Sequence, residues 1–303
     1  MVEGLTLGRR DSSRDRIGKS TTIELLVRHG SLDITRHRIE EGKHFYLDEA
    51  RDWAGFEFIY ILSGSLTFGE GAEQIALRAG EYLHHHGLPQ RAFFRVAEDV
   101  ELLMVASPPT YHLVQDEVQE MLALARSVEE KDKETEGHCH RLERLAILTG
   151  ERLGLSGQKL INLSYGAYLH DIGKVRVPDG ILGKADALSD EEWGKMRRHP
   201  EYGQEMLREK DFLEEAGRIV RAHHERFDGS GYPDGRRAEE IPIEARIIAV
   251  VDAYDAMTSE RPYQPAKARE RALEELQLGA GTHFDPRVVR AFRSVLAEND
   301  VDA

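Results

Sequence analysis

Short apolar runs separated by glycines fill the first third of the chain. Residues Glu57–Leu62 are rich in β-branched and aromatic side chains, and Ser65–Phe68 alternates apolar with small polar positions, so both predict strands. Ser63-Gly64 between them predicts a turn, and Glu101–Ala106 predicts another strand. Many short strands with glycine-rich connections are typical of a small β-barrel or sandwich.

The hydrophobic period changes after Pro108-Pro109, because consecutive prolines end regular structure. From Tyr111 onward, apolar residues recur every three or four positions, which predicts helices. The residues of two such stripes are Val114, Val118, Met121, Leu122, Leu124 and Ala125, then Leu142, Leu145, Ala146 and Leu153. We therefore predict a multidomain α and β protein, with a mobile tail over 1–20, a β-barrel over 21–108 and an all-α domain over 112–303.

Composition supports two ordinary globular domains. The chain has 303 residues, of which 40% are hydrophobic and 32% charged, and no stretch reaches the roughly 18 apolar residues that span a bilayer. The N-terminal residues lack the apolar segment of a secretory signal. A single cysteine, Cys139, excludes an intrachain disulfide framework and favours a reducing cytoplasm. The formal net charge of -14 argues against binding to duplex nucleic acid, but not against a small anionic nucleotide.

Histidines and carboxylates form compact polar motifs in the predicted helical domain. Five of the seven histidines after Leu113 belong to these motifs. The residues of the motifs are Glu134, His138, His170, Asp171, His199, His223, His224, Asp252 and Asp255. Imidazole and carboxylate ligands without a thiolate suit Fe, Mn, Ni or Zn, and this set exceeds what one tetrahedral zinc needs.

Spacing within the motifs indicates more than one ion. A carboxylate can bind two ions through its two oxygens, so adjacent His170 and Asp171 could serve two metals. Glu134 and His138 are four residues apart and would share one face of a helix. Lys174 lies four residues after His170, which places its ammonium within reach of the same site. Two metals about 3.5–4 Å apart can generate hydroxide and stabilise both oxygens of an in-line phosphoryl displacement.

These motifs resemble those of the HD-GYP family, part of the HD superfamily of metal-dependent phosphohydrolases. His170-Asp171 is similar to the superfamily signature, and His223–Pro233 resembles the HD-GYP extension, with Gly231-Tyr232-Pro233 as its name-giving tripeptide. The similar stretches also include His199-Pro200-Glu201, Asp252–Ser259 and Arg261-Pro262-Tyr263. The resemblance spans about residues 128–292 and implies an all-α HD-GYP domain.

The resemblance implies a site for two or three divalent ions, Fe or Mn. Its metal ligands would be Glu134, His138, His170, Asp171, His199, His223, His224 and Asp252. Asp171 and Lys174 would act in catalysis, Asp171 by bridging the metals, while Lys174 and Arg261 would contact substrate phosphate. Gly231-Tyr232-Pro233 would border the bound substrate and provide a docking surface for GGDEF-domain cyclases.

Two positions beside the motifs need a separate interpretation. Three residues after Arg261 the family often has a second basic residue for phosphate, where this chain has Gln264, and Lys267 could compensate. Asp255 lies three residues after Asp252, and we expect it to support a ligand rather than to bind a metal itself.

The activity that the resemblance implies is hydrolysis of cyclic di-GMP to linear pGpG, and a third metal held by Glu134 would support further cleavage to GMP. Two alternatives stay open. Gln264 leaves room for a phosphohydrolase of another nucleotide, such as a mixed guanine–adenine cyclic dinucleotide. The other alternative is a catalytically weak signalling module that docks partners through the Gly231 loop and the barrel, although so many converging ligands argue against it.

The N-terminal strands and the segment Leu77–Tyr82 resemble a cupin barrel. A metal-binding cupin has a paired-histidine motif and a later histidine, where this chain has only His44 and then Pro89-Gln90-Arg91. In His84-His85-His86, alternate side chains of a strand face one way, so at most two could converge. We therefore expect a sensor or dimerisation module, with a homodimer as the assembly, rather than a metal site.

Overall fold

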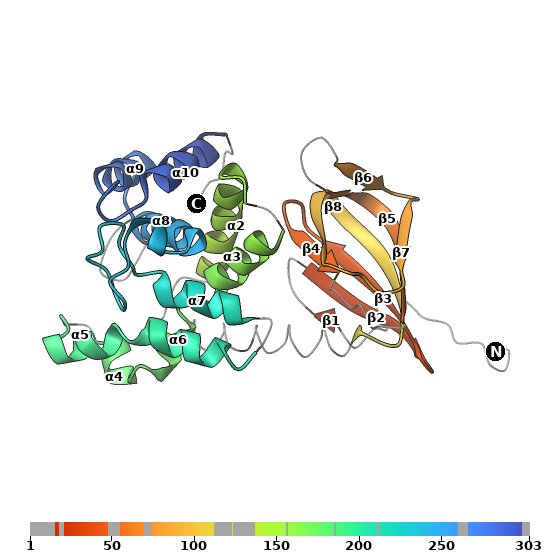
Figure 1. Cartoon of the computed structure of the whole chain (residues 1–303), viewed down its shortest axis with the longest axis horizontal. Coiled ribbons are helices and arrows are strands. Elements are labelled where there is room, and N and C mark those ends of the chain that lie inside the picture. Colours follow the sequence, from red (N-terminus) through yellow and green to blue (C-terminus); the bar gives the residue numbers. More distant parts are fainter. Residues whose placement is uncertain are drawn as a thin grey trace. The chain divides into compact units, whose positions relative to one another are not determined.

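A computed structural model of the protein describes residues 16–17, 21–47, 55–69, 74–111, 123, 137–155, 157–184, 186–210, 213–259 and 266–298. The chain divides into two compact units, residues 1–122 and 123–303 (Figure 1). The first unit carries strands and the second carries helices, so the predicted order of a β domain and then an α domain is confirmed. The predicted boundary near residues 108–112 stays a prediction, because residues 112–122 lie outside the described part of the chain.

The N-terminal unit is an antiparallel sheet around a central long strand. Its strands are β1 (Arg16–Ile17), β2 (Thr21–His29), β3 (Leu32–Ile39), β4 (His44–Leu47), β5 (Phe56–Phe68), β6 (Ile75–Arg78), β7 (Tyr82–His85) and β8 (Ala92–Ser107). The strand order is β1-β2-β3-β8-β5-β6, with β4 paired to β8 and β7 paired to β5. Strand β8 thus pairs with three neighbouring strands, and it ends directly before Pro108-Pro109, where the sequence predicts the end of regular structure. Residues 16–17 of the predicted tail form β1, and the rest of that tail lies outside the described residues.

Alternating side chains of these strands fill the interior of the sheet. Strand β5 buries every second residue at its start, and β8 does so over several positions. The buried apolar cluster consists of Ile39, Leu47, Ile59, Ile61, Leu66, Phe94, Val96, Val100 and Leu102. An interior filled with such side chains is a packed core, so the period-2 pattern predicted this unit correctly.

The turn predicted at Ser63-Gly64 is wrong, because β5 runs through it. The ladder between β5 and β8 shifts register near Ile61 and Ser63, as at a β-bulge, while the strand continues to Phe68. Gly64 adopts φ 75°, and a Cβ built there would lie 2.0 Å from the carbonyl oxygen of Asp99. Gly64 therefore permits a bend within one strand, although glycine at this position of the sequence suggested that the strand ended there.

The second unit is a bundle of helices. They are α2 (His138–Arg152), α3 (Gln158–Leu169), η2 (Ile172–Arg176, a short 3-10 helix), α4 (Asp179–Leu182), α5 (Asp190–Met196), α6 (His199–Leu207), α7 (Glu214–Ala222), η4 (Ala238–Glu240), α8 (Ile243–Thr258), α9 (Arg269–Leu278) and α10 (Pro286–Glu298). Among the described helices, none has both the length and the apolar character that crossing a bilayer requires.

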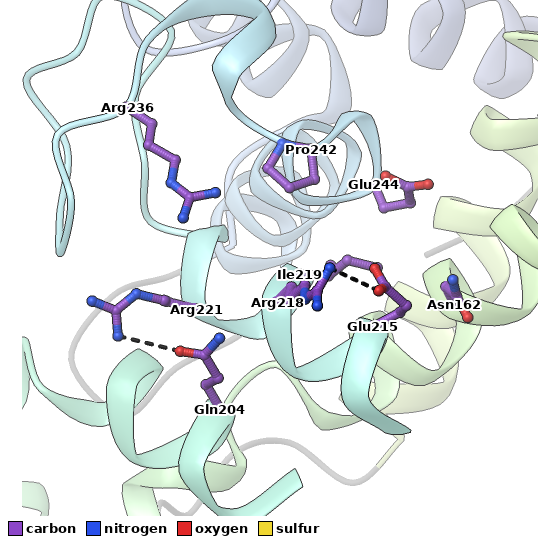
Figure 2. A pocket seen from close by; sticks show the side chains of 9 residues that line it. All are labelled: Asn162, Gln204, Glu215, Arg218, Ile219, Arg221, Arg236, Pro242 and Glu244. Carbon is purple, nitrogen blue, oxygen red and sulfur yellow. Dashed lines mark hydrogen bonds and ion pairs between the residues drawn. The ribbon is translucent and has the colours of Figure 1, made fainter. Parts of the chain in front are cut away.

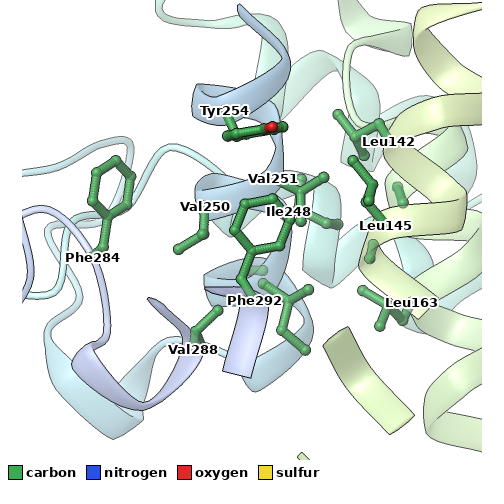
Figure 3. Packing of buried hydrophobic residues seen from close by; sticks show 14 of the residues in the cluster. Leu142, Leu145, Leu163, Ile248, Val250, Val251, Tyr254, Phe284, Val288 and Phe292 are labelled. Atoms are coloured by element: carbon green, nitrogen blue, oxygen red, sulfur yellow. The ribbon is translucent and has the colours of Figure 1, made fainter. Parts of the chain in front are cut away.

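Helix α8 is the central element of this unit. It packs against α2, α3, α7, α9 and α10, and Figure 3 shows its Ile248, Val251 and Tyr254 among side chains of neighbouring helices. The Tyr254 ring meets the Phe292 ring of α10 edge to face, with centroids 5.0 Å apart. Full burial of side chains of this size stabilises a fold by about 1.5–3 kcal/mol each. Helix α8 is therefore a fixed platform for the polar residues near its C-terminal end.

The predicted stripe at Leu142, Leu145 and Ala146 is buried on α2, and Leu153 packs against the same cluster. This confirms the helical period in that segment. The earlier stripe, Val114 to Ala125, lies outside the described residues apart from residue 123, so it stays a prediction.

Gly64→Ala is expected to destabilise the N-terminal unit by more than about 2 kcal/mol, because it combines a left-handed φ with overpacking against Asp99. Gly42→Ala is the matched control, since Gly42 has φ 79° but nothing within 4 Å of a built Cβ. Hydrogen–deuterium exchange of β5 and β8 peptides over a denaturant series measures both variants in the full chain. Equal losses of protection in the two variants would contradict the close approach to Asp99.

Candidate metal centre

Two groups of imidazoles and carboxylates converge inside the helical unit. In each group, one ligand atom from every residue lies within 4.8 Å of the others. The first group is Asp171, His199, His223 and His224, and the second is His138, His170 and Asp252. All seven residues were predicted as metal ligands, and the structure brings them together from distant parts of the sequence.

The ends of helices carry most of these ligands. His138 and His199 are the first residues of α2 and α6, while His170 and His223 directly follow α3 and α7. Asp252 instead lies within α8. Since the last carbonyl groups of a helix have no partner within that helix, a ligand placed there can use them.

Three histidines hydrogen-bond to such carbonyl oxygens through Nδ1. The contacts are His170 to Ala167 at 2.9 Å, His199 to Met196 at 2.8 Å and His223 to Val220 at 2.6 Å. A carbonyl oxygen can only accept, so Nδ1 must carry the proton and donate it. In a neutral imidazole the lone pair then belongs to Nε2, which is the form that binds a metal.

The Nε2 atoms face one another around Asp171. His170 Nε2 lies 3.2 Å from Asp171 Oδ2, whereas His199 Nε2 lies 3.2 Å from Oδ1 of the same carboxylate. The Nε2 atoms of His199 and His223 are 3.4 Å apart, although both are acceptors in the tautomer fixed by their carbonyl partners. Among the described residues, Asp171 Oδ1 is buried without a hydrogen-bond partner of good geometry. Converging lone pairs with no proton between them fit a bound cation, and Asp171 stands between the two groups.

Electrostatics keeps these ligands in their binding forms. Burial opposes the charge of Asp171, but the Lys174 ammonium, whose Nζ lies 2.7 Å from Oδ2, holds the pKa of Asp171 well below its usual range. Burial lowers the pKa of His223 well below its usual range, and burial with the neighbouring His199 lowers the pKa of His224 to about 3. The carboxylate is thus ionised and these two imidazoles are neutral at neutral pH.

Asp252 completes the second group. Its Oδ1 lies 3.9 Å from His138 Nε2 and 4.0 Å from His170 Nε2. Asp255 lies on the other side of His138 and contacts its Nδ1 at 2.6 Å. Burial opposes ionisation of Asp255, yet hydrogen bonds from His138 and Arg141 lower its pKa to about 2. This contact is the one expected of a residue that supports His138, whose own role as a metal ligand stays a prediction.

The loop Gly231-Tyr232-Pro233 packs against the first group. The Tyr232 ring lies 4.9 Å from the His224 ring, and the Arg197 guanidinium lies 5.5 Å from the centre of the Tyr232 ring. A Cβ on Gly231 would lie 2.3 Å from the backbone nitrogen of Arg226, so only glycine allows this approach. The loop therefore borders the ligand cluster, while its contacts with a substrate or a cyclase stay predictions.

Several predicted site residues cannot be placed. Glu134, Arg261 and Gln264 lie outside the described residues. The predicted compensation by Lys267 has a competing contact, because Lys267 Nζ lies 2.7 and 2.8 Å from the two carboxylate oxygens of Glu275.

The sequence interpretation missed Arg141, which holds Asp255 with Nε at 2.8 Å and Nη2 at 3.1 Å. The spacing of residues in the sequence could have indicated this role of Arg141. Arg141 follows His138 by three residues, as Asp255 follows Asp252, so each pair shares a helix face.

A cavity of about 490 Å³ lies in the same unit and contains none of the ligand residues. Figure 2 shows its lining, with Arg221 hydrogen-bonded to Gln204 and Arg218 paired with Glu215. Arg221 also contacts both carboxylate oxygens of Asp234, at 2.7 and 2.9 Å. Since acidic side chains already pair these guanidinium groups, the charge of this cavity does not mark it as an anion site.

Two of the three histidines in the run of the N-terminal unit lie on one side, with the rings of His84 and His86 5.9 Å apart. His85 contacts Glu57 at 2.9 Å, while the rings of His84 and His86 lie 5.9 and 5.1 Å from the Phe56 ring. Strand alternation thus separates His85 from its two neighbours, as the period of a strand predicts.

Comparisons with known proteins concern both units. The cyclic di-GMP phosphodiesterase response regulator RpfG of Xanthomonas campestris is 42% identical over 181 residues, which is 59% of this chain and 48% of that protein. The 3′3′-cGAMP-specific phosphodiesterase 2 of Vibrio cholerae is 39% identical over 55% of this chain and 32% of that protein. This chain therefore spans half or less of the length of these relatives.

For the N-terminal unit, a similar solved structure is the Cupin_2 domain of an XRE family transcriptional regulator from Enterobacter cloacae. It is 14% identical, with a TM-score of 0.26, and covers 30% of this chain and 99% of that chain.

The helical unit and its histidine-aspartate cluster match a described family. The HD domain matches residues 111–288, a range that contains both ligand groups and more than half of the chain. The His170-Asp171 pair, the convergence of histidines from helix ends and this match agree, and the protein therefore belongs to the HD domain family.

Proposed function

We propose that this protein is a metal-dependent phosphodiesterase that hydrolyses cyclic di-GMP to linear pGpG. The observation that carries the proposal is the position of Asp171, whose two oxygens face histidines of two different ligand groups. Relatives named as cyclic di-GMP phosphodiesterases support the choice of substrate. Hydrolysis of a soluble second messenger is also in keeping with a cytoplasmic location.

The two ligand groups fit two divalent ions, Fe or Mn, because their donors are imidazole nitrogens and carboxylate oxygens without a thiolate. When bound, such ions supply Lewis acidity and a nucleophile derived from water. Asp171 would contribute one oxygen to each ion. Glu134 would hold a third ion, which would support cleavage of pGpG to GMP.

Residues of the chain would position and neutralise the scissile phosphate. Lys174 is 15% exposed in its side chain, so its ammonium can meet a ligand while it stays beside Asp171. There it would offset negative charge that develops on the phosphate oxygens, with Arg261 as a second cation. Hydrolysis adds water across the P–O3′ bond, which leaves a 5′-phosphate and a free 3′-hydroxyl. Tyr232 would cover the side of the site next to His224.

A mixed guanine–adenine cyclic dinucleotide is the second candidate substrate. The contact of Lys267 with Glu275 favours this second substrate. Position 264 carries glutamine instead of a basic residue, and Lys267 does not replace that basic residue while it pairs with Glu275. A relative named as a 3′3′-cGAMP-specific phosphodiesterase adds support. Parallel assays with both dinucleotides and analysis of the products decide between the two.

The N-terminal unit would regulate this activity as a sensor and would mediate a homodimer. The described interior of this unit is filled with apolar side chains, so it does not identify the signal that the sensor would bind.

The Gly231-Tyr232-Pro233 loop would dock GGDEF-domain cyclases, since it lies on the border of the ligand cluster. A catalytically weak interaction module is the competing reading, and metal content and turnover distinguish the two.

His199→Ala is expected to remove one ion and to lower turnover of cyclic di-GMP by at least ~100-fold, because Nε2 of His199 faces Asp171 in the first group. Protein purified anaerobically, with Fe or Mn added, provides the metal count per chain and the yield of pGpG and GMP. His140→Ala is the control, since His140 is exposed and belongs to neither group. Two bound ions with no turnover of either dinucleotide would contradict the proposed substrate class.

Lys174→Ala is expected to lower kcat/KM by about 100-fold while both ions stay bound, because it removes a cation from the phosphate and no metal ligand. Lys195→Ala is a matched control, since Lys195 pairs with Glu191 on the exposed surface of α5. Steady-state kinetics with a metal count checks both variants. If Lys174→Ala matched Lys195→Ala in kcat/KM, Lys174 would have no role at the phosphate.

A further inference from the structure

His138 differs from the other histidines in what its Nδ1 contacts. Of the four imidazoles whose Nδ1 partners the structure describes within the two groups, three use backbone carbonyls. His138 instead contacts Oδ2 of Asp255 at 2.6 Å. A carboxylate accepts a stronger hydrogen bond than a carbonyl group does, and it places negative charge behind the ring.

Asp255 is itself fixed in place. It is 2% exposed, and Arg141 donates from Nε to Oδ1 at 2.8 Å and from Nη2 to Oδ2 at 3.1 Å. Arg141 Nη2 also contacts Ser259 Oγ at 3.2 Å. A planar guanidinium that grips both oxygens fixes the plane of the carboxylate, which a single point charge cannot do.

The same contacts tie α2 to α8. Helix α2 carries His138 and Arg141 three residues apart, and α8 carries Asp252 and Asp255 three residues apart. One residue of each pair belongs to the second ligand group, and the other residues form the supporting ion pair. The ion pair thus holds the ligand-bearing end of α2 against the buried helix that carries Asp252.

We propose that Asp255 and Arg141 are a positioning pair for His138, which controls occupancy of the second ligand group separately from the first. The inference rests on the two-ion centre of the proposed function. An anionic partner keeps the proton on Nδ1 and makes Nε2 a better ligand, and loss of such a partner typically weakens metal binding about 10- to 100-fold. In the first group, His199 and His223 use backbone carbonyls and keep these partners.

Asp255→Asn tests the pair, because an asparagine amide can donate to Nδ1 and so favour the tautomer with the proton on Nε2. Anaerobic titration of the full chain with Mn²⁺ alone is expected to show one ion at wild-type affinity and one ion weakened about 10- to 100-fold. In metal-free protein, ¹⁵N NMR is expected to show His138 changing from the Nδ1–H to the Nε2–H tautomer, while His170 keeps its proton on Nδ1.

Asp285→Asn is the matched control. Asp285 is also 2% exposed and pairs with a guanidinium, Arg246 Nη1 at 2.6 Å, but it touches neither ligand group. Asparagine also serves as a helix cap at this position before α10, so the variant isolates the loss of a buried charge. It is expected to leave both Mn²⁺ affinities and the His138 tautomer unchanged.

If Asp255→Asn does not fold, Arg141→Lys decides, since the Arg141 side chain is 30% exposed and the lysine keeps its charge but not its two-pronged grip. Arg141→Lys is expected to weaken the affinity for the ion of the second ligand group by a smaller factor than Asp255→Asn does. Wild-type affinity for both ions in the variant, or equal weakening of both, would overturn the positioning role. A wild-type chain that binds fewer than two ions would overturn the two-ion centre itself, and this inference with it.

Discussion

Hydrogen bonds from histidine Nδ1 to the carbonyl groups of helix ends are the contacts on which the candidate metal centre depends. Each of them satisfies a helix carbonyl and sets the tautomer of a ligand at the same time. The result is a buried cluster of lone pairs, in which leaving a carboxylate oxygen such as Asp171 Oδ1 unsatisfied costs about 1–3 kcal/mol. A cation that removed this cost would bind the folded state alone, so metal binding would be coupled to the stability of the helical unit.

Close packing of backbones brings the ligands within reach of one another. A Cβ on Gly173 of η2 would lie 1.9 Å from the carbonyl oxygen of His199 and 2.5 Å from the backbone nitrogen of Gly203. Only glycine at this position lets η2 approach α6 so closely, and Asp171 and His199 are the functional residues at that contact. The distance of 3.2 Å between Asp171 Oδ1 and His199 Nε2 is thus a consequence of backbone packing as much as of side-chain choice.

Sequence patterns predicted seven residues that converge in the candidate centre, because histidine and aspartate are rare in a protein core. The period of the apolar residues likewise predicted a β unit and then a helical unit. The sequence pattern could not predict which carbonyl groups accept from the histidine Nδ1 atoms, because every residue has a carbonyl group. Only the fold selects those of Ala167, Met196 and Val220. The bend at Gly64 was misread for the same reason, since its cause is the backbone of Asp99 on another strand.

With two divalent ions bound, the local charge of the centre would differ in sign from the charge of the whole chain. A formal net charge of -14 repels long polyanions, yet the two ligand groups contain only Asp171 and Asp252 as carboxylates against five imidazoles. Two divalent ions would exceed the charge of two carboxylates, and Lys174 adds a further positive charge at the same place. Such a centre would attract a small phosphodiester over the short distance that screening allows, while the acidic net charge would discourage extended nucleic acids. Under the proposed function, selection for a compact cyclic dinucleotide over duplex DNA or RNA would therefore follow from where the charges lie, before any base is recognised.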